Sequence, residues 1–181
     1  NIPELVYLAP TNCEEYFAMR DWTIDQNKFP VAIRMPCNGI NHTTEPVQKD
    51  YSDLNKYKIT QNGSKIAILA LGDFFQLGEK TADYIEQQSG QKPTLINPRY
   101  ITGLDKELLT ELKKTHEKII TLEDGILDGG FGQKIASFYG SSPVKVYNFG
   151  LKKEFLDRYN AQEVLKNNHL TPEQIWQVIK N

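Results

Sequence analysis

Two acidic residues, Glu123 and Asp124, stand side by side after an apolar segment, 118–122, that has the pattern of a buried strand. Adjacent carboxylates at a strand end can act as a general acid and base or hold a metal ion. We favour a structural interpretation, in which Asp124 caps the following turn and Glu123 pairs with a neighbour. Arg99, after the strand-like segment 93–96, can bind an anion through its fork of donors. An ion pair between Arg99 and one of these two carboxylates is an equal alternative.

A glycine-rich turn, Gly129-Gly130-Phe131-Gly132, precedes a helical pattern and resembles loops that hold phosphate at a helix N-terminus. It lacks the lysine and hydroxyl of a P-loop, and its spacing is not G-x-G-x-x-G. A tight turn with a close helix approach is therefore favoured. The three histidines lie far apart, and neither Cys13 nor Cys37 stands in a metal or nucleophile motif. Metal binding through histidine and cysteine is not expected.

The first 36 residues predict one β-α-β unit. An apolar run ends at Pro10, a helix follows over 12–26, opened by a capping box of Thr11 and Glu14, and a strand follows over 31–36. Such a unit is too small to bury a core alone. Residues 37–56 show no periodicity and are interpreted as a linker.

Residues 57–181 alternate strand and helix patterns, which predicts a three-layer α/β/α domain with a mostly parallel sheet. The Asn62-Gly63 pair between 57–60 and 65–71 predicts a β-hairpin. Helices are expected to begin near Asp73, Asp105 and Thr171. Open sheets of this kind bind ligands at the carboxyl ends of their strands, which is where the candidate residues stand.

The composition excludes several classes of protein. Lys+Arg is 21 against Asp+Glu 23, a net charge of −2, which argues against a nucleic-acid binder. No apolar run approaches the roughly 18 residues of a membrane span, and no secretory leader is recognisable. Two cysteines cannot form a disulfide framework, so a cytoplasmic location is expected. Because the chain begins with Asn-Ile-Pro rather than Met, we expect a fragment of a longer protein.

Several segments together resemble the transketolase-like thiamine diphosphate enzymes. Ile2–Thr11 is similar to a strand-to-helix passage near the end of their pyrimidine-binding domain, and Val31–Pro36 to its last strand. Other segments match the family's C-terminal domain: Ile68–Gly72, Ile101–Asp105, Thr121–Gly125 and Gly129–Gly132. The passage Asn148–Leu151 with Phe155 resembles the 1-deoxy-D-xylulose-5-phosphate synthase family most closely.

The resemblance implies a transferase that condenses decarboxylated pyruvate with glyceraldehyde 3-phosphate and feeds isoprenoid, thiamine and pyridoxal synthesis. It implies thiamine diphosphate and Mg²⁺ in the full-length enzyme, bound by motifs that this sequence does not contain. The fragment is therefore expected to bind neither cofactor and to be inactive alone. The implied partners are the missing N-terminal domains of the same chain and a second copy in a homodimer. The C-terminal domain is expected to supply dimer contacts and the rim of the active-site channel.

One departure from the family concerns substrate binding. The family's last strand ends in "R-[YF]-P-R-G", and the second arginine helps to hold the substrate phosphate. Here Arg34 matches the first arginine, but Cys37 takes the place of the second. Losing one charge-assisted hydrogen bond should weaken phosphate binding by about 1.5–3 kcal/mol. Arg34, Arg99 and Cys37 are therefore the candidate substrate-binding residues, with Arg99 as a possible compensating cation and a different acceptor as the consequence.

Two other interpretations stay open. The β-subunit of a 2-oxo acid dehydrogenase has a C-terminal domain of similar architecture and a similar acidic and glycine-rich turn. A non-catalytic assembly module without any cofactor is the second alternative.

The chain also departs from the closing "F-I-x-H-G" motif of the synthase family, because it has Phe155-Leu156-Asp157-Arg158 there.

Overall fold

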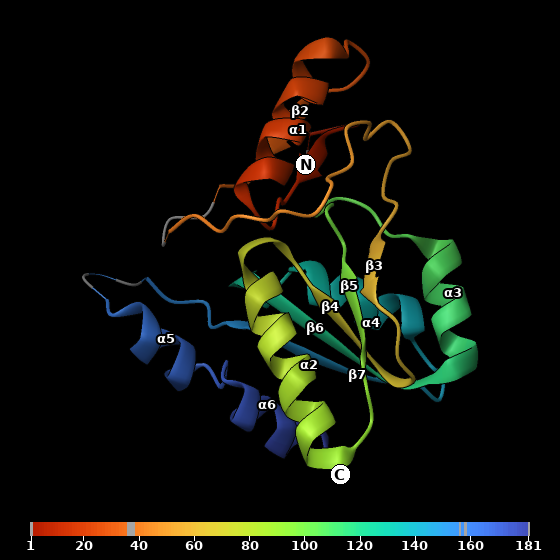
Figure 1. Ribbon diagram of the computed structural model, residues 1–181, viewed down its shortest axis with the longest axis vertical. Coiled ribbons are helices and arrows are strands. Elements are labelled where there is room, and N and C mark those ends of the chain that lie inside the picture. Colours follow the sequence, from red (N-terminus) through yellow and green to blue (C-terminus); the bar gives the residue numbers. More distant parts are fainter. Residues whose placement is uncertain (1, 36–38, 156, 158, 181) are drawn as a thin grey trace.

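Five strands form the central sheet in the spatial order β3 (Lys58–Gln61), β5 (Thr94–Asn97), β4 (Lys65–Ala70), β6 (His116–Ile126) and β7 (Lys145–Leu151) (Figure 1). The computed structural model describes residues 2–35, 39–155, 157 and 159–180. Only β3 is antiparallel to its neighbour, and the other three pairings are parallel. The mostly parallel sheet is confirmed.

The predicted hairpin is wrong, because β3 pairs with β5 and not with β4. After β3, the amide of Gly63 donates to Thr94 Oγ1 at 3.0 Å, which fixes the turn on the start of β5. Lys65 has a φ of 63°, so the chain changes direction there before β4 begins. Every residue of β4 after Lys65 is buried, whereas the first three residues of β3 are exposed. A strand buried on both faces belongs in the middle of a parallel sheet, and β3 takes the edge.

Helices cover both faces of the sheet, which confirms the three-layer α/β/α fold (Figure 1). On one face, α2 (Phe75–Ser89) and α6 (Pro172–Ile179) pack on a cluster that includes Ile68, Leu122 and Ile175. A short 3-10 turn, η1 (Gly72–Phe74), precedes α2. On the other face, α3 (Lys106–Thr115) and α4 (Phe131–Tyr139) pack on Leu69 and Ile119. As predicted, Asp105 and Thr171 are the N-caps of α3 and α6.

A small β-α-β unit lies at one end of this sheet (Figure 1). Its strands β1 (Val6–Leu8) and β2 (Val31–Ile33) pair in parallel, with α1 (Cys13–Asp25) between them in sequence. The helix is confirmed, but the capping box is shifted by one residue: Asn12 accepts from the Glu15 amide at 2.8 Å, and the Glu15 carboxylate accepts from the Thr11 amide at 2.8 Å.

The β-α-β unit is joined to the main sheet through the segment after β5. The Ala9 amide donates to Arg99 O, and the Ile101 amide donates to Tyr7 O, each at 2.8 Å. These bonds place β1 alongside residues 99–101, at the carboxyl end of β5. Because the unit cannot bury its own core, this docking completes a cluster that contains Leu8, Trp22 and Tyr100.

The described residues of the predicted linker, 39–56, contain no helix or strand. They are nevertheless packed, since Tyr51 is fully buried against Trp22. Helix α5 (Ala161–Asn167) was not predicted from the sequence, and none of its residues is buried. The division of the chain at 36 and 56 stays a prediction. Among the described residues, no helix has the length and apolarity needed to cross a membrane.

Candidate functional site

Arg34 connects the β-α-β unit to the centre of the main sheet. It follows the last strand of the unit, β2, and its Nη1 lies 3.2 Å from Asp124 Oδ1. The Nη2 of Arg34 donates to the backbone oxygen of Asp124 at 3.2 Å. The two residues are 90 positions apart in sequence. The predicted substrate-binding candidate Arg34 is therefore held at the carboxyl end of β6.

This ion pair lies in the wall of a pocket of about 440 Å³. The pocket opens where β4 and β6 end, which is the usual ligand position in an open α/β sheet. Its charged residues come from four elements or their ends: Arg34, Asp73, Lys80 and Asp124. Its apolar wall is supplied by η1, α2, β7 and α5, through Phe74, Leu77, Leu151, Ala161, Val164 and Leu165. A concave site with an apolar wall and a few converging polar groups is typical of small-molecule binding.

Burial governs the two carboxylates of this pocket. It raises the pKa of Asp73 and of Asp124 above their usual values, and the Arg34 guanidinium opposes this rise in both. The Asp73 carboxylate also raises the pKa of Asp124, because two like charges face one another. Arg34 therefore neutralises the chain's own acids.

Glu123 caps helix α4, and among the residues that the structure describes it has no ion-pair partner. Its carboxylate accepts from the amides of Phe131 and Gly132, each at 2.8 Å, and the residue is 3% exposed. The expected roles of the two acids are thus reversed, because Asp124 makes the ion pair. Neighbouring side chains in a strand point to opposite faces, so Glu123 faces α4 while Asp124 faces the Arg34 pocket.

The glycine-rich turn allows the backbone to pass close to the Glu123 carboxylate. A Cβ on Gly130 would lie 2.5 Å from Glu123 Oε2 and 2.6 Å from Ile126 O. Since the Glu123 carboxylate already occupies the amides at the start of α4, the turn offers no phosphate cradle. The tight-turn interpretation is supported.

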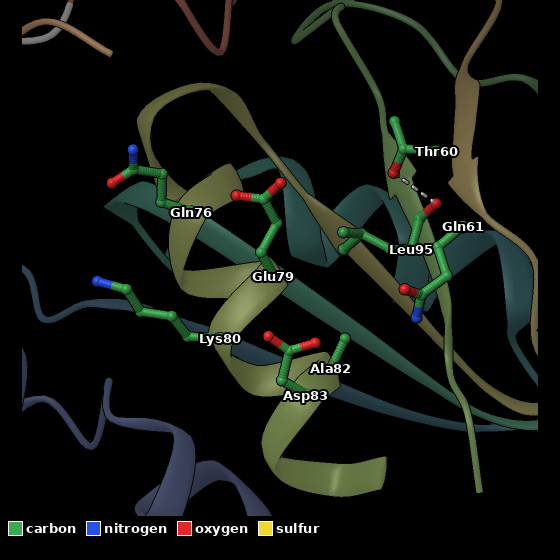
Figure 2. A pocket seen from close by; sticks show the side chains of 8 residues that line it. All are labelled: Thr60, Gln61, Gln76, Glu79, Lys80, Ala82, Asp83 and Leu95. Carbon is green, nitrogen blue, oxygen red and sulfur yellow. Dashed lines mark hydrogen bonds between the residues drawn. The ribbon is translucent and has the colours of Figure 1, made fainter. Parts of the chain in front are cut away.

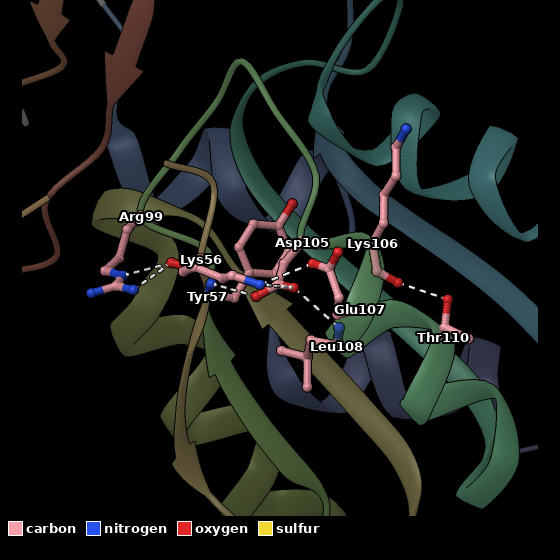
Figure 3. Close-up of polar contacts among 8 residues, drawn as sticks. All are labelled: Lys56, Tyr57, Arg99, Asp105, Lys106, Glu107, Leu108 and Thr110. Carbon is pink, nitrogen blue, oxygen red and sulfur yellow. Dashed lines mark hydrogen bonds and ion pairs between the residues drawn. The ribbon is translucent and has the colours of Figure 1, made fainter. Parts of the chain in front are cut away.

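Arg99 is buried, with 3% of its surface exposed, and it connects the linker to the sheet (Figure 3). Its Nε donates to Lys56 O at 3.1 Å, its Nη2 contacts the same oxygen, and its Nη1 contacts Gln48 Oε1. The guanidinium also lies over the ring of Tyr51, at 5.8 Å from the centroid. The predicted ion pair with Glu123 or Asp124 is wrong. Arg99 follows β5, and its acceptors are Lys56 O and Gln48 Oε1 in the linker instead.

Arg34 and Arg99 are not brought together. Arg99 lines a separate cavity of about 400 Å³ between α1, β3 and the linker, together with Glu15 and Asn97. The third candidate, Cys37, lies outside the described residues, so its position relative to either cavity stays a prediction.

A third hollow, of about 500 Å³, runs between α2 and the edge strand β3 (Figure 2). Glu79 and Asp83 stand one turn apart on α2 beside this hollow, and burial together with the Asp83 charge raises the pKa of Glu79. Within the described ranges, no group of three or more His, Cys, Asp or Glu side chains could hold a metal ion. This hollow is therefore a polar groove without a metal site.

Sequence reasoning missed most of the pocket beside Arg34. Asp73 was expected at the carboxyl end of a strand and at a helix start, but without a role of its own, and α5, which supplies Val164 and Leu165, was not expected at all. The signal that pointed to Asp73 was its place directly after β4. The contribution of α5 had no comparable signal, since the helix is short and polar.

Comparison with known proteins agrees with this fold. Residues 55–175 match the sequence family described as "Transketolase, C-terminal domain". A 1-deoxy-D-xylulose-5-phosphate synthase from Clostridium beijerinckii is 30% identical over 181 residues, which is 98% of this chain and 29% of the relative. The synthase of Alkaliphilus oremlandii is 33% identical, over 99% of this chain and 29% of its own length. This chain thus spans under a third of these relatives.

Solved structures show the same fold at lower identity. A split-gene transketolase, described as an inactive beta4 tetramer, superposes with a TM-score of 0.80 at 20% identity, over 99% of this chain and 57% of that one. The transketolase of Campylobacter jejuni gives a TM-score of 0.72 at 17% identity, over 99% of this chain and 26% of its own. The expected resemblance is confirmed, and the chain belongs to the transketolase C-terminal domain family.

Proposed function

We propose that this chain is the C-terminal part of a thiamine diphosphate-dependent transferase of the 1-deoxy-D-xylulose-5-phosphate synthase type. The similarity to synthases over almost the whole chain carries this proposal. The reaction type is the transfer of a two-carbon unit from pyruvate, after decarboxylation, to an aldehyde acceptor. Two copies of the longer chain would form the active enzyme.

The residues present do not fit the cofactor. The described part of the chain contains no acidic or histidine cluster that could hold Mg²⁺. The amides at the start of α4, which are the natural place for a diphosphate, are taken by the Glu123 carboxylate. We therefore assign thiamine diphosphate and Mg²⁺ to the preceding part of the longer enzyme and derive no step through them.

The role of this chain is to form one rim of the active-site channel. The Arg34–Asp124 pair supports this role, because it links the last strand of the β-α-β unit to the ligand-binding end of the main sheet. A fixed angle between the two parts would keep the pocket in register with a cofactor bound next to the β-α-β unit. Orientation of this kind is a recognised contribution to catalysis.

The direct test is calorimetric titration of this chain with thiamine diphosphate and Mg²⁺. We expect no binding at micromolar concentrations, and a dissociation constant in that range would refute the assignment. In the longer enzyme, restoring the family's arginine with Cys37→Arg should lower the Michaelis constant for glyceraldehyde 3-phosphate. An unchanged constant would show that residue 37 does not set acceptor affinity. The dehydrogenase and assembly-module alternatives are separated from the proposal by the residues that precede Asn1 in the gene.

A further inference from the structure

The Asn62-Gly63 pair, which joins β3 to β4, is a dipeptide with chemistry of its own. Asparagine loses its side-chain amide most readily before glycine, because glycine has no Cβ to hinder the ring that forms. In this reaction the Gly63 nitrogen attacks Asn62 Cγ, and the new C–N bond closes a five-membered succinimide. The Asn62 Nδ2 group leaves as ammonia and takes the proton of the Gly63 amide with it. Water from the solvent then opens the ring to aspartate or isoaspartate.

The fold leaves the electrophile of this reaction open to solvent but holds its nucleophile. Asn62 is exposed, and its side chain has no hydrogen bond to any residue that the structure describes. The Gly63 amide donates to Thr94 Oγ1 at 3.0 Å, and Thr94 is 3% exposed. That hydroxyl also lies 2.8 Å from His116 Nε2, so it is fixed from a second side. An amide bonded to a buried acceptor in this way keeps its proton until the structure opens locally.

Gly63 is also confined by the neighbouring backbone. A Cβ at this position would lie 2.1 Å from Lys92 O and 2.3 Å from the carbonyl carbon of Pro93, so the two chain segments are in direct contact. On either side, the Ser64 amide donates to Lys92 O at 3.0 Å, and Gln61 Nε2 donates to Pro93 O at 2.9 Å. To close the succinimide, the Gly63 nitrogen must swing towards the asparagine side chain. This movement would break the contacts with residues 92–94.

Gly63 is released when β3 separates from β5. As the edge strand, β3 has a partner on one side only, and its first three residues are exposed. The register between the two strands also shifts between Ile59 and Gln61. One further tether, from Thr60 Oγ1 to Leu95 O at 3.2 Å, is visible in Figure 2. Short, exposed strands open locally at a lower cost in free energy than the core does, so deamidation at this pair is coupled to the edge of the sheet.

We propose that Asn62-Gly63 is a modification site controlled by the fold: Thr94 blocks succinimide formation while β3 is paired, and opening of the edge permits it. The change is irreversible for the strand. Isoaspartate routes the chain through the former side chain, which inserts one additional methylene group into the backbone between residues 62 and 63. The amides of Gly63 and Ser64 then no longer reach Thr94 and Lys92 together, so β3 loses its register. Neither step depends on the enzyme activity proposed above.

The test follows deamidation of the purified chain by peptide mapping and mass spectrometry. A synthetic peptide of residues 59–66 gives the rate of the unstructured sequence in the same buffer. We expect Asn62 to react at least about tenfold more slowly in the folded chain than in the peptide, because a hydrogen bond and a backbone contact must both be broken. In urea that unfolds the chain, the two rates should agree. Equal rates without urea would overturn the proposal.

Two variants with the same chemical change separate the Thr94 hydroxyl from the rest of the strand pairing. Thr94→Val removes the acceptor of the Gly63 amide and keeps the shape of the side chain, so Asn62 should deamidate about fivefold faster than in the wild type. Thr60→Val is the matched control, since it removes the bond to Leu95 O and leaves the Gly63 amide bonded. It should change the rate by less than about twofold. An unchanged rate in a folded Thr94→Val chain would contradict the role of this hydroxyl.

Hydrogen exchange on the unaltered chain keeps the proposal testable if Thr94→Val does not fold. The Gly63 amide should exchange at least about tenfold more slowly than in the peptide, and exchange at the peptide rate would overturn its protection. The irreversible step is tested on chain aged in urea and returned to buffer. Molecules with isoaspartate at position 62 should exchange the amides of β3 at least about tenfold faster than unmodified molecules in the same sample. Equal exchange in the two forms would refute the loss of register.

Discussion

Replacing Glu123 by alanine tests whether the acidic pair at the end of β6 is structural or chemical. The carboxylate accepts from the amides of Phe131 and Gly132, each at 2.8 Å, and has 3% of its surface exposed. Glu123→Ala leaves both buried amides without an acceptor. Each such loss costs about 1–3 kcal/mol, so we expect the free energy of unfolding to fall by about 3 kcal/mol.

Urea unfolding followed by circular dichroism measures this loss. With a slope of about 1–3 kcal/mol per molar urea, the midpoint should fall by about 1–3 M. Glu123→Gln keeps one acceptor oxygen and should lose about half as much free energy. Glu117→Ala, an exposed position on the same strand, is the matched control and should change the free energy of unfolding by less than about 0.5 kcal/mol.

The pH dependence gives a second check on Glu123. Burial raises its pKa above the usual 4.5, so the folded protein holds this proton to a higher pH than the unfolded chain does. The stability difference between wild type and Glu123→Ala should therefore be larger near pH 4.5 than near pH 7.5, because it falls as the pH rises through the raised pKa. A loss below about 1 kcal/mol at both pH values would refute the cap.

Three further changes can be checked in the same urea titration. Gly78→Ala should destabilise by about 2 kcal/mol although alanine favours helices, since the new Cβ would lie 2.5 Å from the Cβ of Ala70. Burial lowers the pKa of His116 below 6.5, so the unfolded chain binds this proton more readily and stability should rise with pH through that range; His116→Gln should flatten the rise. Arg34→Met should cost about 1 kcal/mol, because its ion pair is part-exposed, whereas Arg20→Met, which removes an exposed pair, should cost almost nothing.

Most helices and strands could be predicted because the residues that start and end them lie within a few positions of each boundary. Asp105 and Thr171 are N-caps as expected, and each accepts from an amide three residues later. The hairpin failed for a non-local reason: an Asn-Gly pair favours a tight turn but does not decide which strand becomes the neighbour. The need to bury β4 on both faces placed β5 between the two strands.

The position of the candidate site at the strand ends was predicted, but the contacts of its side chains were not. That Glu123 and Asp124 end a strand is visible in the sequence, whereas the face that each side chain takes depends on the register of β6. The same limit applies to Arg99, whose acceptors are a linker carbonyl and Gln48, which no motif announces. Arg34 was expected to bind a ligand, and the structure adds that Asp124 holds it.

The two arginines show why the position of a cation matters more than its presence. Arg99 is enclosed by the linker and joins two parts of the fold, and its guanidinium donates to Lys56 O and Gln48 Oε1. Arg34 reaches a pocket, yet two carboxylates stand beside it and leave no net positive charge there. An arginine kept at the end of this strand can therefore be engaged by a carboxylate of the chain itself instead of being left free for an anion.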